Sequence, residues 1–233
     1  MSESLPIVLI PGLLDSARLY AAQIPELWRC GPVMVADHTR DDSMSAIARR
    51  ILGSAPPRFA LAGLSMGGYI CFEIMRQAPA RVAKLALLDT SARADTPEAG
   101  ALRRTQMTLA SNGRLGEVVE QQFDRMIHPL HRNDPQLREI NRLMAEDVGP
   151  QAFIRQQTAI MGRPDSRPTL AAISCPTLVL VGEQDELTPP DRALEMAHGI
   201  RGARLVTVPE CAHLSTLERP REVTRALLEW LKG

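Results

Sequence analysis

Short, largely apolar runs alternate along the chain with segments whose apolar residues recur at helical spacing. The runs show no alternation with polar residues, which is the pattern of parallel strands whose sheet is covered on both faces. Strands are predicted at 5–10, 33–36, 58–63, 82–89, 176–182 and 203–208, and helices near 43–54, 66–78, 190–198 and 220–231. This order predicts a doubly wound α/β fold with a mostly parallel sheet.

Residues 93–167 interrupt the alternation, because no strand pattern occurs there. Helical patterns take its place: Asp134 followed by Pro135 is typical of a helix start, and Gly149-Pro150 indicates another. We therefore predict a helical lid, inserted after the strand that ends near Asp89. The α/β core is expected to comprise residues 1–92 and 168–233.

Composition narrows the classes of partner. The formal net charge is zero and aromatic residues make up 3% of the chain, which argues against nucleic acid and anionic membranes as partners. The N-terminal apolar run has no basic flank, and no run is long enough to cross a bilayer, so a cytoplasmic protein is expected. The four cysteines lack metal-ligand spacing and are expected to be reduced. A small-molecule substrate is the expected partner, and no pattern indicates an oligomeric state.

The stretch LAGLSMGGY, residues 61–69, has a predicted strand before it and a predicted helix after it. A serine between glycines is common in loops, but a strand that turns directly into a helix holds its central residue in strained geometry. Gly63 and Gly67 leave room for such a turn, so Ser65 is predicted to be a nucleophile. The Met66 N–H begins the helix, where negative charge is favoured, and is the first predicted oxyanion donor.

A serine nucleophile needs a base and an orienting acid, in the order serine, acid, histidine. His213 follows the last predicted strand and is the favoured base, whereas His38 also follows a strand but precedes the serine. Asp185, just past the strand at 176–182, is the favoured acid. Asp89 is the alternative, with a turn-capping role as its structural explanation.

The loop IPGLLDSARLY after the first strand should supply the second oxyanion donor, for which we choose the Leu13 N–H. The substrate pocket is expected to be apolar and lined in part by the lid. Candidate lining residues are Leu14, Met107, Phe123, Met126, Ile127, Met161 and Leu187. Arg155 and Arg163 are the candidates for binding an acidic substrate.

Together these motifs resemble the α/β-hydrolase fold superfamily, in particular its lid-bearing esterases, enol-lactonases and carbon–carbon bond hydrolases. The matching stretches are IPGLLDSARLY, LAGLSMGGY, VAKLALLDTSAR, GEQDELTPP and VPECAHLSTLERP. The resemblance implies acyl transfer to water with no cofactor and no metal. It also implies that Ser65, Asp185 and His213 form a catalytic triad.

One departure concerns the first loop, where the family usually has His-Gly and this chain has Pro11-Gly12. The backbone donor should survive, but the hydrogen bonds of that histidine are lost. The expected function is hydrolysis of a carboxylic ester of a small to medium, largely apolar substrate. The alternatives are an enol-lactonase or carbon–carbon bond hydrolase acting on a keto acid, and a non-catalytic binding protein with the same fold.

Overall fold

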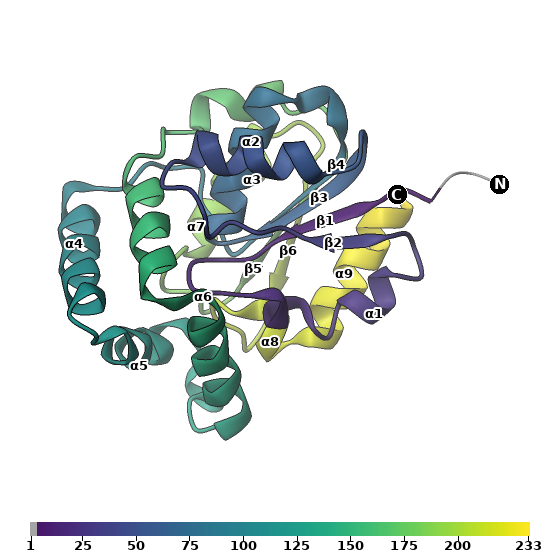
Figure 1. Cartoon of the computed structure of the whole chain (residues 1–233). Coiled ribbons are helices and arrows are strands. Elements are labelled where there is room, and N and C mark those ends of the chain that lie inside the picture. The colour runs from purple at the N-terminus through teal and green to yellow at the C-terminus, as the bar shows by residue number, and fades with distance from the viewer. Residues whose placement is uncertain (1–3) are drawn as a thin grey trace.

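The computed structural model describes residues 4–233, so the first three residues of the predicted core lie outside the described part of the chain. The described residues form a six-stranded sheet in the order β2-β1-β3-β4-β5-β6, and every neighbouring pair is parallel (Figure 1). The strands are β1 (Ile7–Ile10), β2 (Val33–Val35), β3 (Phe59–Leu64), β4 (Val82–Leu88), β5 (Thr177–Gly182) and β6 (Arg204–Val208). The predicted α/β fold is confirmed.

Helices cover both faces of the sheet (Figure 1). One face packs against α2 (Met44–Ser54), α3 (Met66–Gln77) and α7 (Pro190–Gly199), and the other against α1 (Ile24–Leu27), α8 (Ser215–Glu218) and α9 (Pro220–Lys232). Successive strand residues point to opposite faces: Val8 and Ile10 join the first apolar cluster, and Ile7 and Leu9 join the second. Both sets are fully buried, which is why β1 contains no polar residue.

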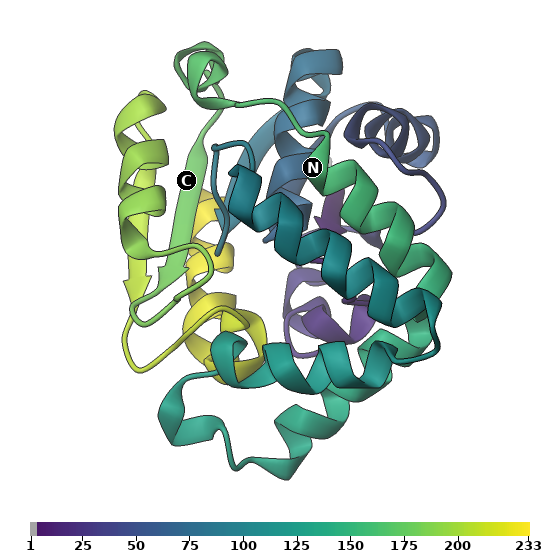
Figure 2. The same cartoon turned by 90° about the vertical axis from the view of Figure 1, so that its left-hand side faces the viewer.

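Three helices lie between β4 and β5: α4 (Pro97–Ser111), α5 (Leu115–Met126) and α6 (Pro135–Met161). Figure 2 shows them together on the side of the molecule away from the two termini of Figure 1. Side chains of Thr96 and Asp134 accept hydrogen bonds from the first backbone N–H groups of α4 and α6, which fixes where these helices begin. At Gly149, with a non-helical φ of 77°, α6 divides into two helical segments joined by a kink, and the second begins at Pro150 as predicted.

Four short 3₁₀ turns complete the described chain: η1 (Ala17–Tyr20), η2 (Pro79–Arg81), η3 (Pro129–His131) and η4 (Arg167–Ala172). The four cysteines, all within the described residues, are free thiols. Across residues 4–233, none of the helices has both the length and the apolar character of a membrane span.

Candidate active site

Ser65 stands at the sharp turn between β3 and α3. Its backbone has φ 54° and ψ −115°, a conformation that a residue with a side chain adopts only under strain. The turn is closed by close backbone packing: a Cβ on Gly63 would lie 2.4 Å from the Gly67 backbone, and a Cβ on Gly67 would lie 2.1 Å from the Ile10 oxygen. This close packing holds the Ser65 side chain rigidly at the carboxyl edge of the sheet.

Three side chains from different strand ends form a chain of hydrogen bonds. His213 Nε2 lies 2.9 Å from Ser65 Oγ, and His213 Nδ1 lies 2.8 Å from Asp185 Oδ2. A carboxylate only accepts hydrogen bonds, so Nδ1 carries the ring proton and Nε2 is free to accept the serine proton. His213 and Asp185 are 3% and 2% exposed, which shields this relay from bulk water.

The Asp185 carboxylate is held by more than the histidine. Its Oδ1 accepts from the N–H groups of Leu187 and Thr188, at 2.8 and 3.0 Å, and its Oδ2 accepts from the Thr188 hydroxyl at 2.6 Å. Burial alone would raise the pKa of Asp185, but the charge of His213 and the hydrogen bonds from His213 and Thr188 keep it below its ordinary value. Asp185 is therefore ionised. Thr188 was not predicted from the sequence.

Asp89 lies apart from this relay. Its two carboxylate oxygens accept hydrogen bonds from the Gly182 N–H, at 2.8 Å, and from the Ser215 hydroxyl, which links the ends of β4 and β5 to the start of α8. Burial, and then the neighbouring charge of Asp185, raises the pKa of Asp89 well above its ordinary value. Its expected turn-capping role is replaced by this bridging role.

The two predicted oxyanion donors lie beside the nucleophile. Leu13 and Ser65 both line the same pocket, and Met66 is the first residue of α3, where a helix has no internal acceptor for its N–H. Within residues 4–233, the Leu13 N–H donates to no backbone or side-chain acceptor. Both groups are thus available to a ligand oxygen in front of Ser65.

The pocket in front of Ser65 has a volume of about 250 Å³. Its apolar wall is formed by Leu13, Met126, Ile160, Leu187 and Leu214. Its polar residues include Arg103, Gln106, Gln122, Arg125 and Glu186, all exposed or half-buried. The helices between β4 and β5 supply residues to both sets, so they form part of the pocket wall.

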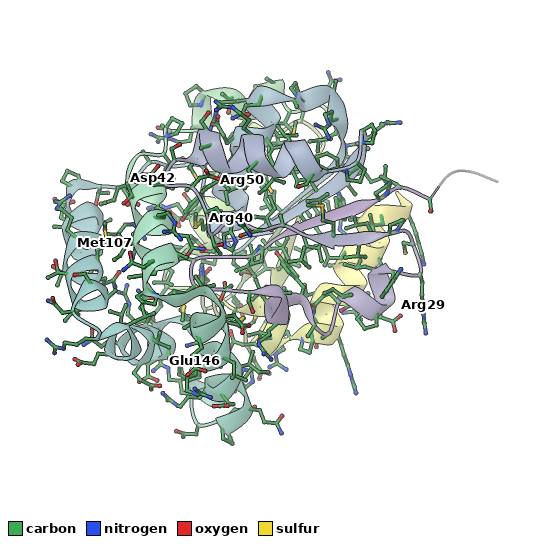
Figure 3. All side chains as sticks on the ribbon, in the orientation of Figure 1. Arg29, Arg40, Asp42, Arg50, Met107 and Glu146 are labelled. Atoms are coloured by element: carbon green, nitrogen blue, oxygen red, sulfur yellow. The ribbon has the colours of Figure 1, made fainter. Side chains whose placement is uncertain are left out.

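Two of the residues predicted to contact substrate, Met126 and Leu187, line this pocket. The other predicted lining residues do not lie in the wall of this pocket: Leu14, Met107, Phe123, Ile127 and Met161. Phe123 and Ile127 are buried in the apolar cluster that also contains residues of the strands and α9, and Leu14 packs against apolar residues of the inserted helices. Met107 lies on α4, the helix at the left of Figure 3.

The arginines considered for an acidic substrate have other partners. Arg155 Nε donates to the Thr39 oxygen at 2.9 Å. Arg163 forms an ion pair with Asp95 at 2.6 Å and lies over the Tyr69 ring, 4.1 Å from its centroid. Both side chains therefore fix α6 to its surroundings.

Asp15 is an acid in the pocket wall that was not predicted from the sequence. It is 5% exposed and lines the pocket. Its Oδ2 lies close to Gly12, since a Cβ added to that glycine would be 2.4 Å from this oxygen. Burial raises the pKa of Asp15 to about 7, against the opposing effects of His213 and of a hydrogen bond from the Gly12 backbone. Its charge in turn favours the protonated form of His213.

A second unpredicted acid, Glu218, joins the inserted helices to the loop of the candidate base. Its carboxylate accepts from the N–H groups of Ala212 and His128, at 2.9 and 2.7 Å, and contacts His131 Nδ1 at 3.1 Å. The N–H of His213 itself donates to the Met126 oxygen at 2.9 Å. These residues all lie within the described range, where no group of three or more His, Cys, Asp or Glu side chains is arranged to hold a metal ion.

Comparison with known proteins gives matches along nearly the whole chain. The model of the alpha/beta hydrolase family matches residues 7–226. A thermophilic esterase from Thermogutta terrifontis, solved with malate bound, is 33% identical and superimposes with a TM-score of 0.90, covering 99% of this chain and 90% of that one. The pimeloyl-(acyl-carrier protein) methyl ester esterase of Nitrosomonas europaea is 27% identical over 190 residues, which cover 78% of this chain and 74% of that protein. The enol-lactonase of Burkholderia xenovorans LB400 has the same fold, with a TM-score of 0.90 at 23% identity over all of this chain and 93% of that one.

Proposed function

The chain belongs to the alpha/beta hydrolase family and is a hydrolase, and from that premise we propose that it cleaves carboxylic esters through an acyl-enzyme on Ser65. The observation that carries the proposal is the continuous relay from Ser65 Oγ through His213 to Asp185, with contacts of 2.9 and 2.8 Å. A serine hydroxyl becomes a useful nucleophile only when a base accepts its proton, and this relay supplies that base. The resemblance to an esterase at 33% identity supports the same reaction.

The reaction follows from the positions of the groups. His213 Nε2 takes the proton as Ser65 Oγ attacks the ester carbonyl carbon, and Asp185 stabilises the imidazolium that forms. The Leu13 and Met66 N–H groups bind the oxyanion, and each such donor is worth roughly 3–4 kcal/mol in comparable sites. His213 then returns the proton to the leaving alcohol, and water repeats the attack to release the acid.

The pocket supports a small to medium, largely apolar acyl group. Its volume of about 250 Å³ and its apolar wall leave room for a short chain. We assign residues 93–167 the role of a lid, because α4, α5 and α6 each contribute to the wall. In this role the lid keeps water away from the oxyanion, and its side chains contribute to substrate specificity.

The position of Asp15 supports a second candidate function, the hydrolysis of an enol-lactone. A lactone is also opened by serine attack on its carbonyl, but the leaving group is an enolate that must gain a proton. An acid beside the nucleophile, with a pKa raised by burial to about 7, can supply that proton near neutral pH. Comparing p-nitrophenyl esters, an enol-lactone and ring-cleavage keto acids as substrates separates this reaction and carbon–carbon cleavage from ester hydrolysis.

The direct test of the proposal is labelling by a fluorophosphonate probe, followed by a series of p-nitrophenyl esters of increasing acyl length. We expect one equivalent of label on Ser65 and the highest kcat/KM for short or medium acyl chains. A protein that is folded but neither labels nor hydrolyses any ester of the series is not a serine esterase, and a non-catalytic role would then replace the proposal.

The pH dependence of kcat should follow His213. Burial lowers the pKa of this ring, but the charge of Asp185 and its hydrogen bond to the ring, with smaller effects of Asp89 and Asp15, outweigh burial and raise the pKa to about 9. The base must be neutral to accept the serine proton, so kcat should be low at pH 6 and rise with pH through about 9. The pH profile of kcat with a substrate whose chemistry is rate-limiting checks this.

A matched variant assigns the ionisation. Asp15 is ionised above a pH of about 7, so Asp15→Asn removes a negative charge near His213 and should move the midpoint to lower pH. Asp147→Asn, on the outer surface of α6, should leave the midpoint unchanged. A flat profile from pH 6 to 10 in the unmodified protein would exclude His213 as the base.

A further inference from the structure

His38 lies at the carboxyl end of β2 and contacts the loop that carries the oxyanion donor. Its Nε2 is 2.8 Å from the Gly12 carbonyl oxygen, and the residue is 2% exposed. A carbonyl oxygen only accepts hydrogen bonds, so Nε2 carries a proton and donates it. Burial lowers the pKa of His38, which keeps the ring neutral and in this tautomer.

The Gly12 carbonyl belongs to the same peptide unit as the Leu13 N–H. A peptide unit is planar and trans, so its C=O and N–H point in opposite directions. A side chain that fixes the direction of the Gly12 oxygen therefore also fixes the direction of the Leu13 N–H. Hydrogen bonding to the oxygen further polarises the unit and makes its N–H a stronger donor.

This peptide unit has few other constraints on its orientation. Pro11 has no N–H, and Leu14 is held at a φ of 62°, which a leucine adopts only under external restraint. The Asp15 N–H reaches the same Gly12 oxygen at 3.2 Å, a longer contact than that of His38. Gln156 of α6 accepts from the next N–H, that of Leu14, at 3.2 Å.

We propose that His38 is a positioning residue for the oxyanion hole: it holds the Gly12–Leu13 peptide so that the Leu13 N–H points at the reacting carbonyl oxygen. The proposal rests on the proposed function, because the direction of this N–H matters only if Ser65 forms an oxyanion. It assigns a role to a histidine that precedes the nucleophile in the chain and does not belong to the triad. It also explains how Pro11 can stand in the position usually occupied by histidine without leaving the loop unsupported.

The loop that carries His38 is itself fixed. Arg155 of α6 donates to the Thr39 oxygen at 2.9 Å, and Asp37 accepts from the Thr39 hydroxyl at 2.6 Å and pairs with Arg40 at 2.8 Å. Figure 3 labels Arg40 in this loop, close to α6. The imidazole thus acts from a rigid support, as a positioning group must.

The test compares His38→Leu, which removes the donor, with His38→Gln, whose amide nitrogen occupies nearly the position of Nε2. His198→Leu, an exposed histidine at the end of α7, is the control. With the ester that the unmodified protein hydrolyses fastest, we expect His38→Leu to lower kcat about 10- to 100-fold with KM changed less than about twofold, because only the transition state uses the donor. His38→Gln should recover most of that loss, and His198→Leu should match the unmodified protein.

Two further measurements separate positioning from a loss of folded protein. Active sites are counted by exhaustive fluorophosphonate labelling. Inhibition is then measured with two compounds. The first is a trifluoromethyl ketone, which forms an oxyanion on Ser65, and the second is the corresponding alkane, which has no carbonyl group and forms no oxyanion. We expect the ketone to bind His38→Leu at least tenfold more weakly per active site and the alkane to bind equally. If leucine prevents folding, His38→Asn, whose amide is too short to reach Gly12, takes its place.

The proposal is overturned if a folded His38→Leu protein keeps its kcat per active site within about twofold, or if it binds the ketone as tightly as the unmodified protein. An unmodified protein that neither labels nor hydrolyses esters contradicts the proposed function itself, and the inference then fails with it. The two failures are distinguished by the unmodified protein alone.

Discussion

Ser65→Ala is expected to lower kcat for ester hydrolysis by about 10⁶, the loss seen when the nucleophile of a comparable triad is removed. The variant should also fail to react with a fluorophosphonate. The change removes one oxygen from a half-buried residue and keeps the same backbone conformation, so the protein should fold normally. Steady-state kinetics, probe labelling and thermal unfolding of the same preparation check these three statements.

Ser111→Ala is the matched control, because Ser111 is exposed at the end of α4. It should retain full activity and labelling. If the Ser65 variant keeps most of its turnover with the control behaving normally, the acyl-enzyme mechanism is wrong and Ser65 serves only the turn.

Asp185→Asn should lower kcat by about 10⁴, as in a comparable triad, while leaving substrate binding nearly unchanged. The carboxylate accepts the Nδ1 proton of His213 at 2.8 Å, whereas an amide nitrogen at that position would donate to Nδ1. The ring would then carry its proton on Nε2, which could no longer accept the proton of Ser65. Separate measurement of kcat and KM checks this, since the effect should fall on kcat.

Asp89→Asn is the control variant for Asp185→Asn. Asp89 is equally buried and also ends a strand, but its carboxylate binds the Gly182 N–H and the Ser215 hydroxyl rather than the histidine. This variant should lose some thermal stability and change kcat far less than Asp185→Asn. The opposite order of kcat losses would assign the orienting acid to β4.

The sheet could be predicted from the sequence because its central strands, β1, β3, β4 and β5, are largely buried and consist almost entirely of apolar residues. Each of the six predicted strands is present, with ends shifted by one or two residues. The turn at Ser65 could also be predicted, because a serine between Gly63 and Gly67 at the junction of a predicted strand and a predicted helix is typical of a tight turn. The contact that requires Gly63 is local, with the Gly67 backbone, whereas Gly67 is required by the Ile10 oxygen of the neighbouring strand β1.

The pocket wall could not be predicted in the same way. The spacing of Phe123 and Ile127 indicates that this face of α5 is buried, but spacing does not say which surface covers it. The structure buries that face against the core, and the neighbouring Gln122, Arg125 and Met126 face the pocket. Contacts between distant segments determine this choice.

The same reasoning applies to Thr188, Glu218 and Asp15. Glu218 and Asp15 act on groups from distant parts of the chain, and the neighbouring sequence does not distinguish them from ordinary surface residues. Thr188 lies only three residues from Asp185, but the sequence does not show that its hydroxyl turns back to that carboxylate. His38 was noted as a histidine at the right sheet edge, but only the 2.8 Å contact with Gly12 indicates what it does there.

The contacts around Met126 and Glu218 bear on whether the inserted helices can be exchanged between relatives. The buried N–H of His213 has the Met126 oxygen as its acceptor, and the buried Glu218 joins the Ala212 and His128 N–H groups. A graft that displaced the backbone of 126–131 would leave the His213 N–H without its acceptor and the Glu218 carboxylate without one of its donors. Each such loss costs roughly 1–3 kcal/mol, in the loop that carries the base. In a chimaera, residues 126–131 of the recipient should therefore be retained. A grafted segment before them should end within α4 or the first turns of α5, and a grafted segment after them should begin after η3.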